Sequence, residues 1–193
     1  TPMQWSQLED SDWRVRHNAL KALGKLGPET LAHRADAVVT MLEDSKRRVR
    51  CQALCTLDKL EPAVLAQHVG AVVARLDDSH WEVRLRALKT LGNLVPATLA
   101  QQAGAVVAKL EDFHSEVREV ALKTLAKLEP AALAQQAEAV IARFEDLSRS
   151  VSCEAFRTLA KVEPATLARH ACTVVARLED SHSGVRKLAL KTL

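Results

Sequence analysis

Residues 8–16 of the chain read LEDSDWRVR, and close copies of this stretch return every 34 residues. The copies are LEDSKRRVR at 42–50, LDDSHWEVR at 76–84, LEDFHSEVR at 110–118, FEDLSRSVS at 144–152 and LEDSHSGVR at 178–186. A strict period of this length is typical of stacked-repeat proteins, in which each unit packs mainly against its neighbours. The sequence therefore predicts a single repeat array over residues 1–193 in place of ordinary globular domains.

Prolines mark the start of each repeat, one per period, at Pro28, Pro62, Pro96, Pro130 and Pro164. Proline is well suited to the first turn of a helix, where its missing N–H costs nothing. The array then divides into a partial unit 1–27, full units 28–61, 62–95, 96–129 and 130–163, and a partial unit 164–193. Because the last unit ends on apolar residues in place of the polar cap that an array needs, we expect the chain to be part of a longer array.

Each unit is predicted to form two antiparallel helices of about four turns each, joined by an acidic loop. In unit 62–95, the apolar residues at helical spacing in the first helix are Leu65, Ala66, Val69, Val72, Val73 and Leu76. Ser79 and Glu82 then match a capping box that would start the second helix. The buried stripe of that second helix comprises Val83, Ala87, Leu91 and Leu94. The predicted fold class is all-α.

This pattern resembles HEAT repeats in their short, PBS-lyase-like form. The resemblance rests on D-x5-R joined to V-R-x-x-A-L-x-x-L and covers the chain from Leu8 onward. It implies a right-handed α-solenoid, a superhelix of stacked helix pairs. It also implies a ladder of ion pairs between adjacent repeats, formed by Asp10, Arg16, Asp44, Arg50, Asp78, Arg84, Asp112, Arg118, Asp180 and Arg186.

The repeat that contains Phe144 departs from this pattern. Ser152 replaces the ladder arginine, and Leu147 replaces the usual loop serine. We therefore expect the ladder to be interrupted there. The departure marks a bend, a softer joint or a contact site, or else it is drift in a tolerant repeat.

Basic residues recur at two positions of the second helices, four residues apart. They are Lys21, Lys89, Lys123, Arg157 and Lys191 at one position and Lys25, Lys59, Lys127 and Lys161 at the other. Side chains four residues apart share a helix face, so stacking should align these nine residues, here called the basic ribbon. In HEAT solenoids the second helices usually line the concave side. The ribbon thus indicates an acidic partner, either a protein segment or a phosphate backbone, unless duplication alone produced it.

Trp13 and Trp81 share the position at which second helices start and are candidate anchors for a protein partner. The favoured hypothesis is a non-catalytic HEAT-repeat scaffold that mediates protein–protein interaction, for example as a structural subunit of a larger assembly. Nucleic-acid binding through a basic concave face is the alternative, with a DNA-glycosylase-like enzyme as an unfavoured version. Similarity to bilin lyases gives a third hypothesis.

No catalytic, cofactor or metal motif is recognisable in the sequence. The net charge is only +3, and no apolar stretch is long enough to span a membrane. Cys51, Cys55, Cys153 and Cys172 follow no ligand spacing, so we expect free thiols in an intracellular reducing compartment. This compartment is expected to be the cytoplasm, or an organelle after removal of a transit peptide. The chain starts at Thr1 without a methionine, which fits either a processed precursor or an excised piece of a longer chain.

Overall fold

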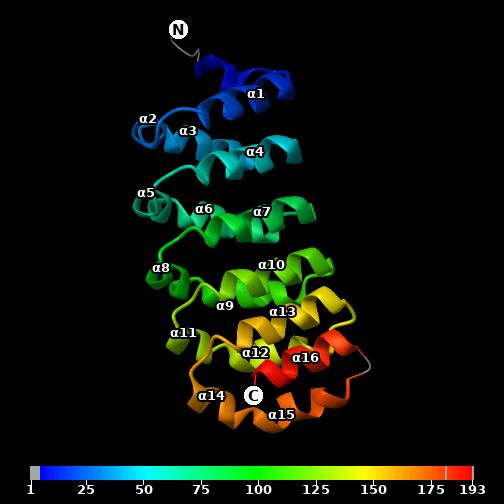
Figure 1. The fold of residues 1–193 in the computed structure, drawn as a ribbon. Helices are drawn as coiled ribbons and strands as arrows, with labels where there is room; N and C mark the ends of the chain where they lie inside the picture. The colour runs from blue at the N-terminus through cyan, green and yellow to red at the C-terminus, as the bar shows by residue number, and fades with distance from the viewer. Residues whose placement is uncertain (1–4, 181, 193) are drawn as a thin grey trace. The chain divides into compact units, whose positions relative to one another are not determined.

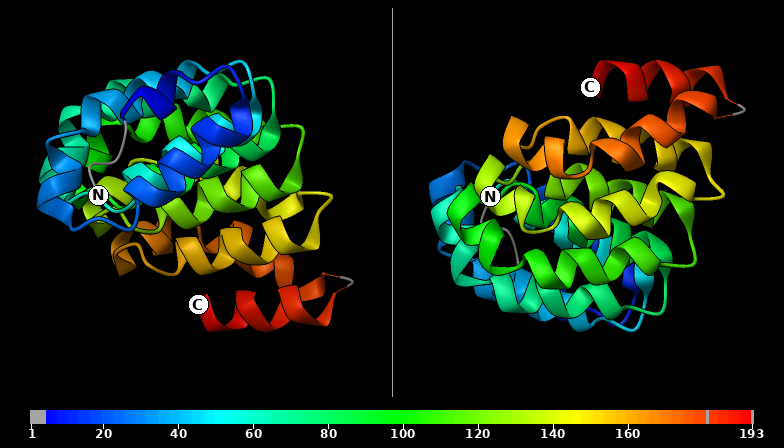
Figure 2. Two further views of the ribbon diagram at one scale, coloured as in Figure 1. Left: turned by 90° about the horizontal axis from the view of Figure 1, so that it is seen from above. Right: turned by 90° about the horizontal axis from the view of Figure 1, so that it is seen from below.

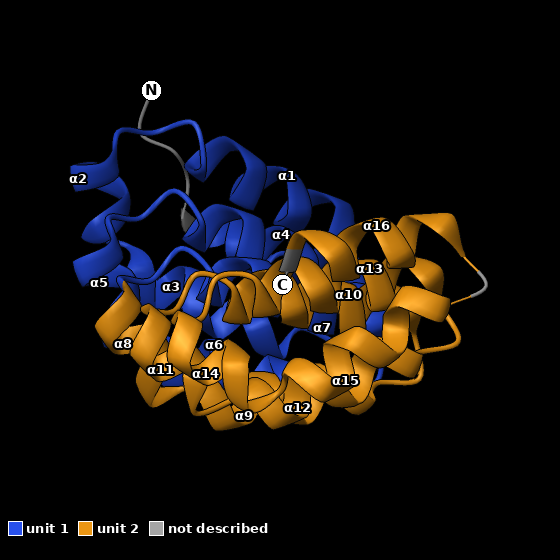
Figure 3. Cartoon of the chain, turned by 60° about the horizontal axis from the view of Figure 1, so that its bottom comes forward, with its two compact units in different colours: residues 1–95 blue, residues 96–193 orange. Residues whose placement is uncertain are grey.

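The computed structural model describes residues 5–180 and 182–192, and these residues contain helices and turns but no β-strand. The chain forms two compact units, residues 1–95 and residues 96–193 (Figure 3). The boundary between Val95 and Pro96 coincides with a repeat boundary predicted from the sequence. None of the described helices is long and apolar enough to cross a membrane.

Unit 1 contains the stump of one repeat followed by two full repeats (Figure 1). Its elements are η1 (Trp5–Glu9), α1 (Trp13–Leu23), α2 (Pro28–Ala32), α3 (Ala35–Thr40), η2 (Met41–Glu43), α4 (Arg47–Leu57), α5 (Pro62–Gln67), α6 (Val69–Ala74), η3 (Arg75–Asp77) and α7 (Trp81–Leu91). The second helices of consecutive repeats pack side by side, α1 on α4 and α4 on α7.

Unit 2 repeats this arrangement. Its elements are α8 (Pro96–Gln101), α9 (Ala103–Ala108), η4 (Lys109–Glu111), α10 (Ser115–Leu125), α11 (Pro130–Ala134), α12 (Ala137–Ile141), η5 (Ala142–Glu145), α13 (Arg149–Leu159), α14 (Pro164–Arg169), α15 (Ala171–Ala176), η6 (Arg177–Glu179) and α16 (Ser183–Thr192). Here α10 packs on α13 and α13 on α16, and the left view of Figure 2 shows the red α16 beside the yellow-orange α13. The prediction of an all-α repeat fold is confirmed.

The prediction of one continuous first helix is wrong. In every full repeat this helix is broken in the middle, as between α5 and α6, where His68 leaves the helical region with φ −109° and ψ 12°. The His68 N–H bonds to the carbonyl of Leu65, three residues back, which closes α5 with a tighter turn. Leu65 and Val72 on the two sides of the break are both buried. Apolar side chains seven residues apart face the core in a continuous or a broken helix, so the pattern could not reveal the break.

The predicted capping box at the start of α7 is also wrong. The N-cap is His80, which makes no side-chain capping bond, and Ser79 lies in the loop before it. The preceding aspartate orders this loop instead, because Asp78 Oδ1 accepts a hydrogen bond from the His80 N–H over 2.9 Å. The same two-residue turn recurs at Asp10, Asp44, Asp112, Asp146 and Asp180. The aspartate of each loop, and not the serine that follows it, therefore accepts the hydrogen bond that orders the loop before the second helix.

The core of each unit lies between the first and second helices. Every member of the expected second-helix stripe, Val83, Ala87, Leu91 and Leu94, is buried. Buried threonines tie neighbouring second helices together. Thr56 Oγ1 donates to the Leu20 carbonyl over 3.0 Å in unit 1, and Thr158 Oγ1 lies 3.4 Å from the Leu122 carbonyl in unit 2. These contacts hold successive repeats, and hence their loops, in a fixed register.

Candidate functional site

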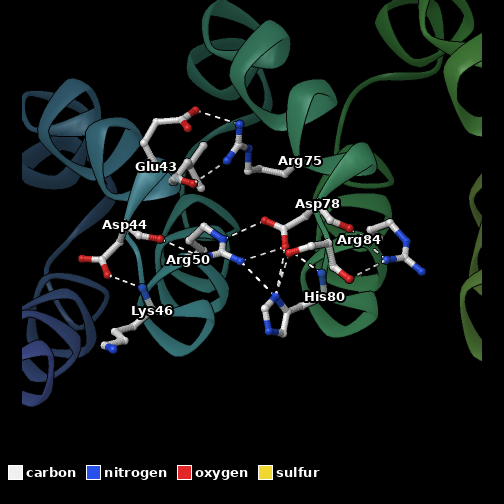
Figure 4. Close-up of polar contacts among 10 residues, drawn as sticks. Glu43, Asp44, Lys46, Arg50, Arg75, Asp78, His80 and Arg84 are labelled. Carbon is white, nitrogen blue, oxygen red and sulfur yellow. Dashed lines mark hydrogen bonds and ion pairs between the residues drawn. The ribbon is translucent and has the colours of Figure 1, made fainter.

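Arginines on the second helices connect consecutive acidic loops of unit 1 (Figure 4). Arg50, on α4, donates from Nε and Nη2 to both carboxylate oxygens of Asp78 over 2.7 and 2.8 Å. Its Nη1 donates to the main-chain oxygen of Asp44 over 2.7 Å. Arg16, on α1, does the same with the Asp44 carboxylate, over 2.6 and 3.0 Å, and with the Asp10 carbonyl over 2.6 Å. One guanidinium thus joins its own loop to the loop of the following repeat.

The aspartates of these pairs are buried and remain ionised. The side chains of Asp44 and Asp78 are only 5% and 4% exposed. Burial raises the pKa of each carboxyl, but the hydrogen bonds from the paired arginine and from the loop N–H outweigh burial. The pKa of both groups therefore lies below its ordinary value of 3.8. Conversely, the hydrogen bond to Asp78 raises the pKa of Arg50.

Among the described residues of unit 2, Arg118 forms one such pair, and the arginine position of the following repeat is occupied by Ser152. Arg118, on α10, donates to the two carboxylate oxygens of Asp146 over 2.8 and 2.7 Å and to the Asp112 carbonyl over 2.8 Å. Asp146 was absent from the expected ladder because its own repeat lacks the arginine, although it stands in register with the other aspartates. At that arginine position Ser152 Oγ donates to the Phe144 carbonyl over 2.9 Å instead.

The remaining residues of the expected ladder lie at the same places in their repeats. Arg84 and Arg186 donate from Nη1 to the carbonyls of Asp78 and Asp180, over 2.8 and 2.7 Å respectively. Each of these arginines therefore fixes its own loop, as Arg16 and Arg50 do.

A second set of arginines also connects neighbouring loops, and the sequence pattern did not predict it. Arg75, directly before the loop leucine, pairs with Glu43 of the preceding loop at 2.8 Å and donates to the Leu42 carbonyl over 2.9 Å. In unit 2, Arg143 pairs with Glu111 at 2.8 Å and Arg177 pairs with Glu145. The only available signal was the recurrence of a basic residue at this position, which also fits a solvated helix end.

All nine residues of the basic ribbon are exposed. In unit 1 they are Lys21, Lys25, Lys59 and Lys89, and in unit 2 they are Lys123, Lys127, Arg157, Lys161 and Lys191. The second helices are shorter than expected, so Lys25, Lys59, Lys127 and Lys161 lie in the turn just beyond the helix and not on its face. Some members have intramolecular partners: Lys123 pairs with Glu119 and Arg157 with Glu154.

One carboxylate lies within the unit 1 part of the ribbon. Asp58 caps the C-terminus of α4 and precedes Lys59. Burial raises its pKa, while a hydrogen bond with Thr90 and the charges of Arg86 and the neighbouring lysines oppose the shift. Asp58 thus offsets part of the positive charge between Lys59 and Lys89.

Comparisons with known proteins give the same repeat class. The family model described as HEAT repeats matches residues 5–71, and the HEAT repeat model matches residues 69–97. The chain thus carries HEAT repeats over residues 5–97. No curated protein sequence matches it.

Solved structures with the same fold include designed helical-repeat proteins. A designed armadillo repeat protein in complex with the peptide (KR)4 is similar with a TM-score of 0.75 and 19% identity, over 99% of this chain and 97% of the other. Computationally designed armadillo repeat proteins for modular peptide recognition give a TM-score of 0.75 and 18% identity, with the same coverage. An engineered protein from a structural genomics consortium gives 0.74 and 18%, over 98% and 93%. At these identities the likeness concerns the all-α solenoid fold alone.

The two candidate aromatic anchors of this HEAT-repeat chain are half-buried at the start of α1 and α7. The ring of Trp13 is covered by guanidinium groups, with Arg14 5.1 Å and Arg48 5.5 Å from its centroid. Cation–π contacts of this kind hold a tryptophan in place. Together with Arg47 and His80, Trp13 lines a cavity of about 330 Å³.

The cysteines of the chain are free thiols. Burial, followed by the proximity of Cys55, raises the pKa of Cys51 to about 11, and burial also raises the pKa of Cys55. Both thiols therefore stay protonated at neutral pH, whereas a metal ligand or nucleophile must be a thiolate. In the part of the chain that the structure describes, no three His, Cys, Asp or Glu side chains converge to hold a metal ion.

Proposed function

We propose that this HEAT-repeat protein is a non-catalytic scaffold and that its basic ribbon binds an acidic segment of a protein partner. The observation that carries the proposal is the exposure of all nine ribbon cations, which repeat at two fixed positions of the repeat. The repeat fold supports it as well, because function in such scaffolds lies in exposed positions carried on a rigid array. Designed armadillo neighbours with this fold were made for modular peptide recognition.

The ribbon is best tested at the lysines beyond the helices. The double variants Lys25→Gln/Lys59→Gln and Lys127→Gln/Lys161→Gln each remove two charges from one unit. The matched control Lys46→Gln/Lys187→Gln removes two exposed charges that lie outside the ribbon. The probe is a fluorescent decaglutamate peptide, and its affinity is measured by anisotropy at low and at physiological salt.

Each ribbon variant should weaken peptide binding by about five- to thirtyfold, since two exposed charge pairs contribute roughly 0.5–1 kcal/mol each. The control should change it less than about twofold, because distant exposed charges are screened. Equal losses in all three variants would refute the ribbon as the binding site. A single-stranded oligonucleotide that binds where the peptide does not, with a steep loss of affinity in salt, would favour the nucleic-acid alternative instead.

A further inference from the structure

The loops of unit 2 carry two large apolar side chains in full contact with solvent. Phe113 is 92% exposed and Leu147 is 104% exposed. Both occupy the loop position that is serine in the other repeats, at Ser11, Ser45, Ser79 and Ser181. Neither side chain contributes to the core of the unit, so folding does not explain why serine is replaced in two consecutive repeats.

A cavity of about 460 Å³ is lined by both of these loops. Besides Phe113 and Leu147, its lining includes four carboxylates and two guanidinium groups, from Glu111, Asp112, Glu145 and Asp146 and from Arg118 and Arg143. Three of these carboxylates are neutralised by arginines, Asp146 by Arg118, Glu111 by Arg143 and Glu145 by Arg177, so the cleft presents its two apolar side chains beside a rim of ion pairs.

A second cavity, of about 350 Å³, lies on the other side of Leu147, where the ladder arginine is replaced by Ser152. Asp146, Ser152 and Asp180 all line it. In the repeats that keep the arginine, a guanidinium binds the carbonyl of the loop aspartate and the carboxylate of the following aspartate. The corresponding acceptors here are the Asp146 carbonyl and the Asp180 carboxylate.

Because Ser152 provides no guanidinium, the side chain of Asp180 should be more exposed than those of the aspartates that pair with an arginine. Its side chain is 17% exposed, whereas those of Asp44, Asp78 and Asp146 are 3–5% exposed. In its own loop, the Nδ1 of His182 lies 3.5 Å from the carboxylate. Arg149 lines the same cavity but lies against Gly184, with Nη2 2.8 Å from the place a Cβ would occupy.

We propose that this edge of unit 2 binds a partner peptide through one apolar and one arginine side chain. The apolar side chain fills the cleft between Phe113 and Leu147. The arginine enters the cavity at Ser152 and makes the contacts that a chain arginine makes in the other repeats. Neighbouring helices pack about 8–10 Å apart, and an extended peptide advances about 3.3–3.6 Å per residue. The expected motif is therefore apolar-x-x-Arg, a basic segment distinct from the acidic partner of the ribbon.

The probe is a labelled ten-residue peptide with Leu-x-x-Arg at its centre and Gly and Ser elsewhere, titrated with the full chain. Ser152→Arg fills the cavity with the consensus side chain and should weaken binding about tenfold or more, since a hydrogen bond to a charged group is lost. Because Ser152 is buried and donates to the Phe144 carbonyl, the melting temperature of this variant is measured as a control for folding. Asp180→Asn should also weaken binding, and so should Phe113→Ser/Leu147→Ser, which restores the consensus serines.

Controls separate this site from simple charge attraction. A peptide with Lys in place of Arg should bind several-fold more weakly, since it lacks the planar fork that matches a carboxylate. The ribbon variant Lys127→Gln/Lys161→Gln should bind the Leu-x-x-Arg peptide as the parent does. Unchanged binding by both Ser152→Arg and Asp180→Asn, or equal affinity for the Lys and Arg peptides, would overturn the proposal. So would no measurable binding to the parent protein.

Discussion

Replacing Arg50 with methionine should lower the stability of unit 1 by about 2–3 kcal/mol. Methionine retains much of the apolar stem of the arginine but removes its charge and all of its donors. The substitution deletes two hydrogen bonds to the Asp78 carboxylate and one to the Asp44 carbonyl. Asp78, whose side chain is 4% exposed, then keeps its hydrogen bond from the His80 N–H but loses the guanidinium that neutralises its charge.

The magnitude follows from the burial of the pair. Removing one partner of a buried ion pair costs about 3–5 kcal/mol. The loops lie at the edge of the unit, so water can reach Asp78 once the guanidinium is gone, and the expected cost falls to about 2–3 kcal/mol. The matched control is Arg47→Met on the same helix, whose pair with Glu82 is 45% and 35% exposed. Pairs this exposed contribute about 0–1 kcal/mol.

The assay is urea unfolding followed by circular dichroism, with the midpoint and the slope fitted separately. Amide hydrogen exchange at His80 reports whether the loop opens before the rest of the unit. A loss below about 0.5 kcal/mol for Arg50→Met, or the same loss for Arg50→Met and Arg47→Met, would refute the ladder as a source of stability. A double-mutant cycle with Asp78→Asn then gives the coupling of the pair, because Asn retains the oxygen that accepts from His80.

Two further predictions follow from the same contacts. Because the folded-state pKa of Asp44, Asp78 and Asp146 lies below 3.8, their stabilisation is complete above that value and is lost as pH falls through the folded-state pKa. The urea midpoint should therefore drop steeply below about pH 4, and a drop that persists unchanged in Asp78→Asn/Arg50→Met would contradict this origin. Thr56→Val should cost about 1 kcal/mol in thermal unfolding, since the Leu20 carbonyl loses the hydrogen bond from the Thr56 hydroxyl and keeps the one from the Gly24 N–H. Thr40→Val, at an exposed threonine, should cost nothing measurable; equal effects would exclude the inter-helix bond as the cause.

The repeat period was sufficient to predict the fold. It placed Pro62 at a helix start and Leu65, Val72 and Val83 in the core, where the structure has them. It could not predict the break at His68, because the buried positions on both sides keep helical spacing. Nor could it distinguish Ser79 from Asp78 as the residue that orders the loop, since both types accept hydrogen bonds from nearby N–H groups.

The site was less predictable because its contacts join different repeats. The D-x5-R spacing identifies both members of each pair, but spacing within one repeat does not say that Arg50 reaches the aspartate of the next. That pairing came from the resemblance to HEAT repeats. The resemblance missed Asp146, whose repeat lacks the arginine, and the pair of Arg75 with Glu43. A basic residue at a helix end has an ordinary explanation in the helix dipole, so its recurrence alone carries little information.

The departures in the fifth repeat separate into two groups with different physical explanations. Phe144 and Phe156 replace leucines of the other repeats, and their rings stack 3.8 Å apart at 12° in the core. Ser152 is buried beside them and bonds to the Phe144 carbonyl, so repacking of the core accounts for all three residues. Repacking does not account for Leu147, which is fully exposed, or for Phe113, whose repeat keeps its ladder arginine. Random substitution in the repeat of Phe144 alone would not explain Phe113, which belongs to the preceding repeat. A binding edge formed by two loops requires an apolar side chain on each of them.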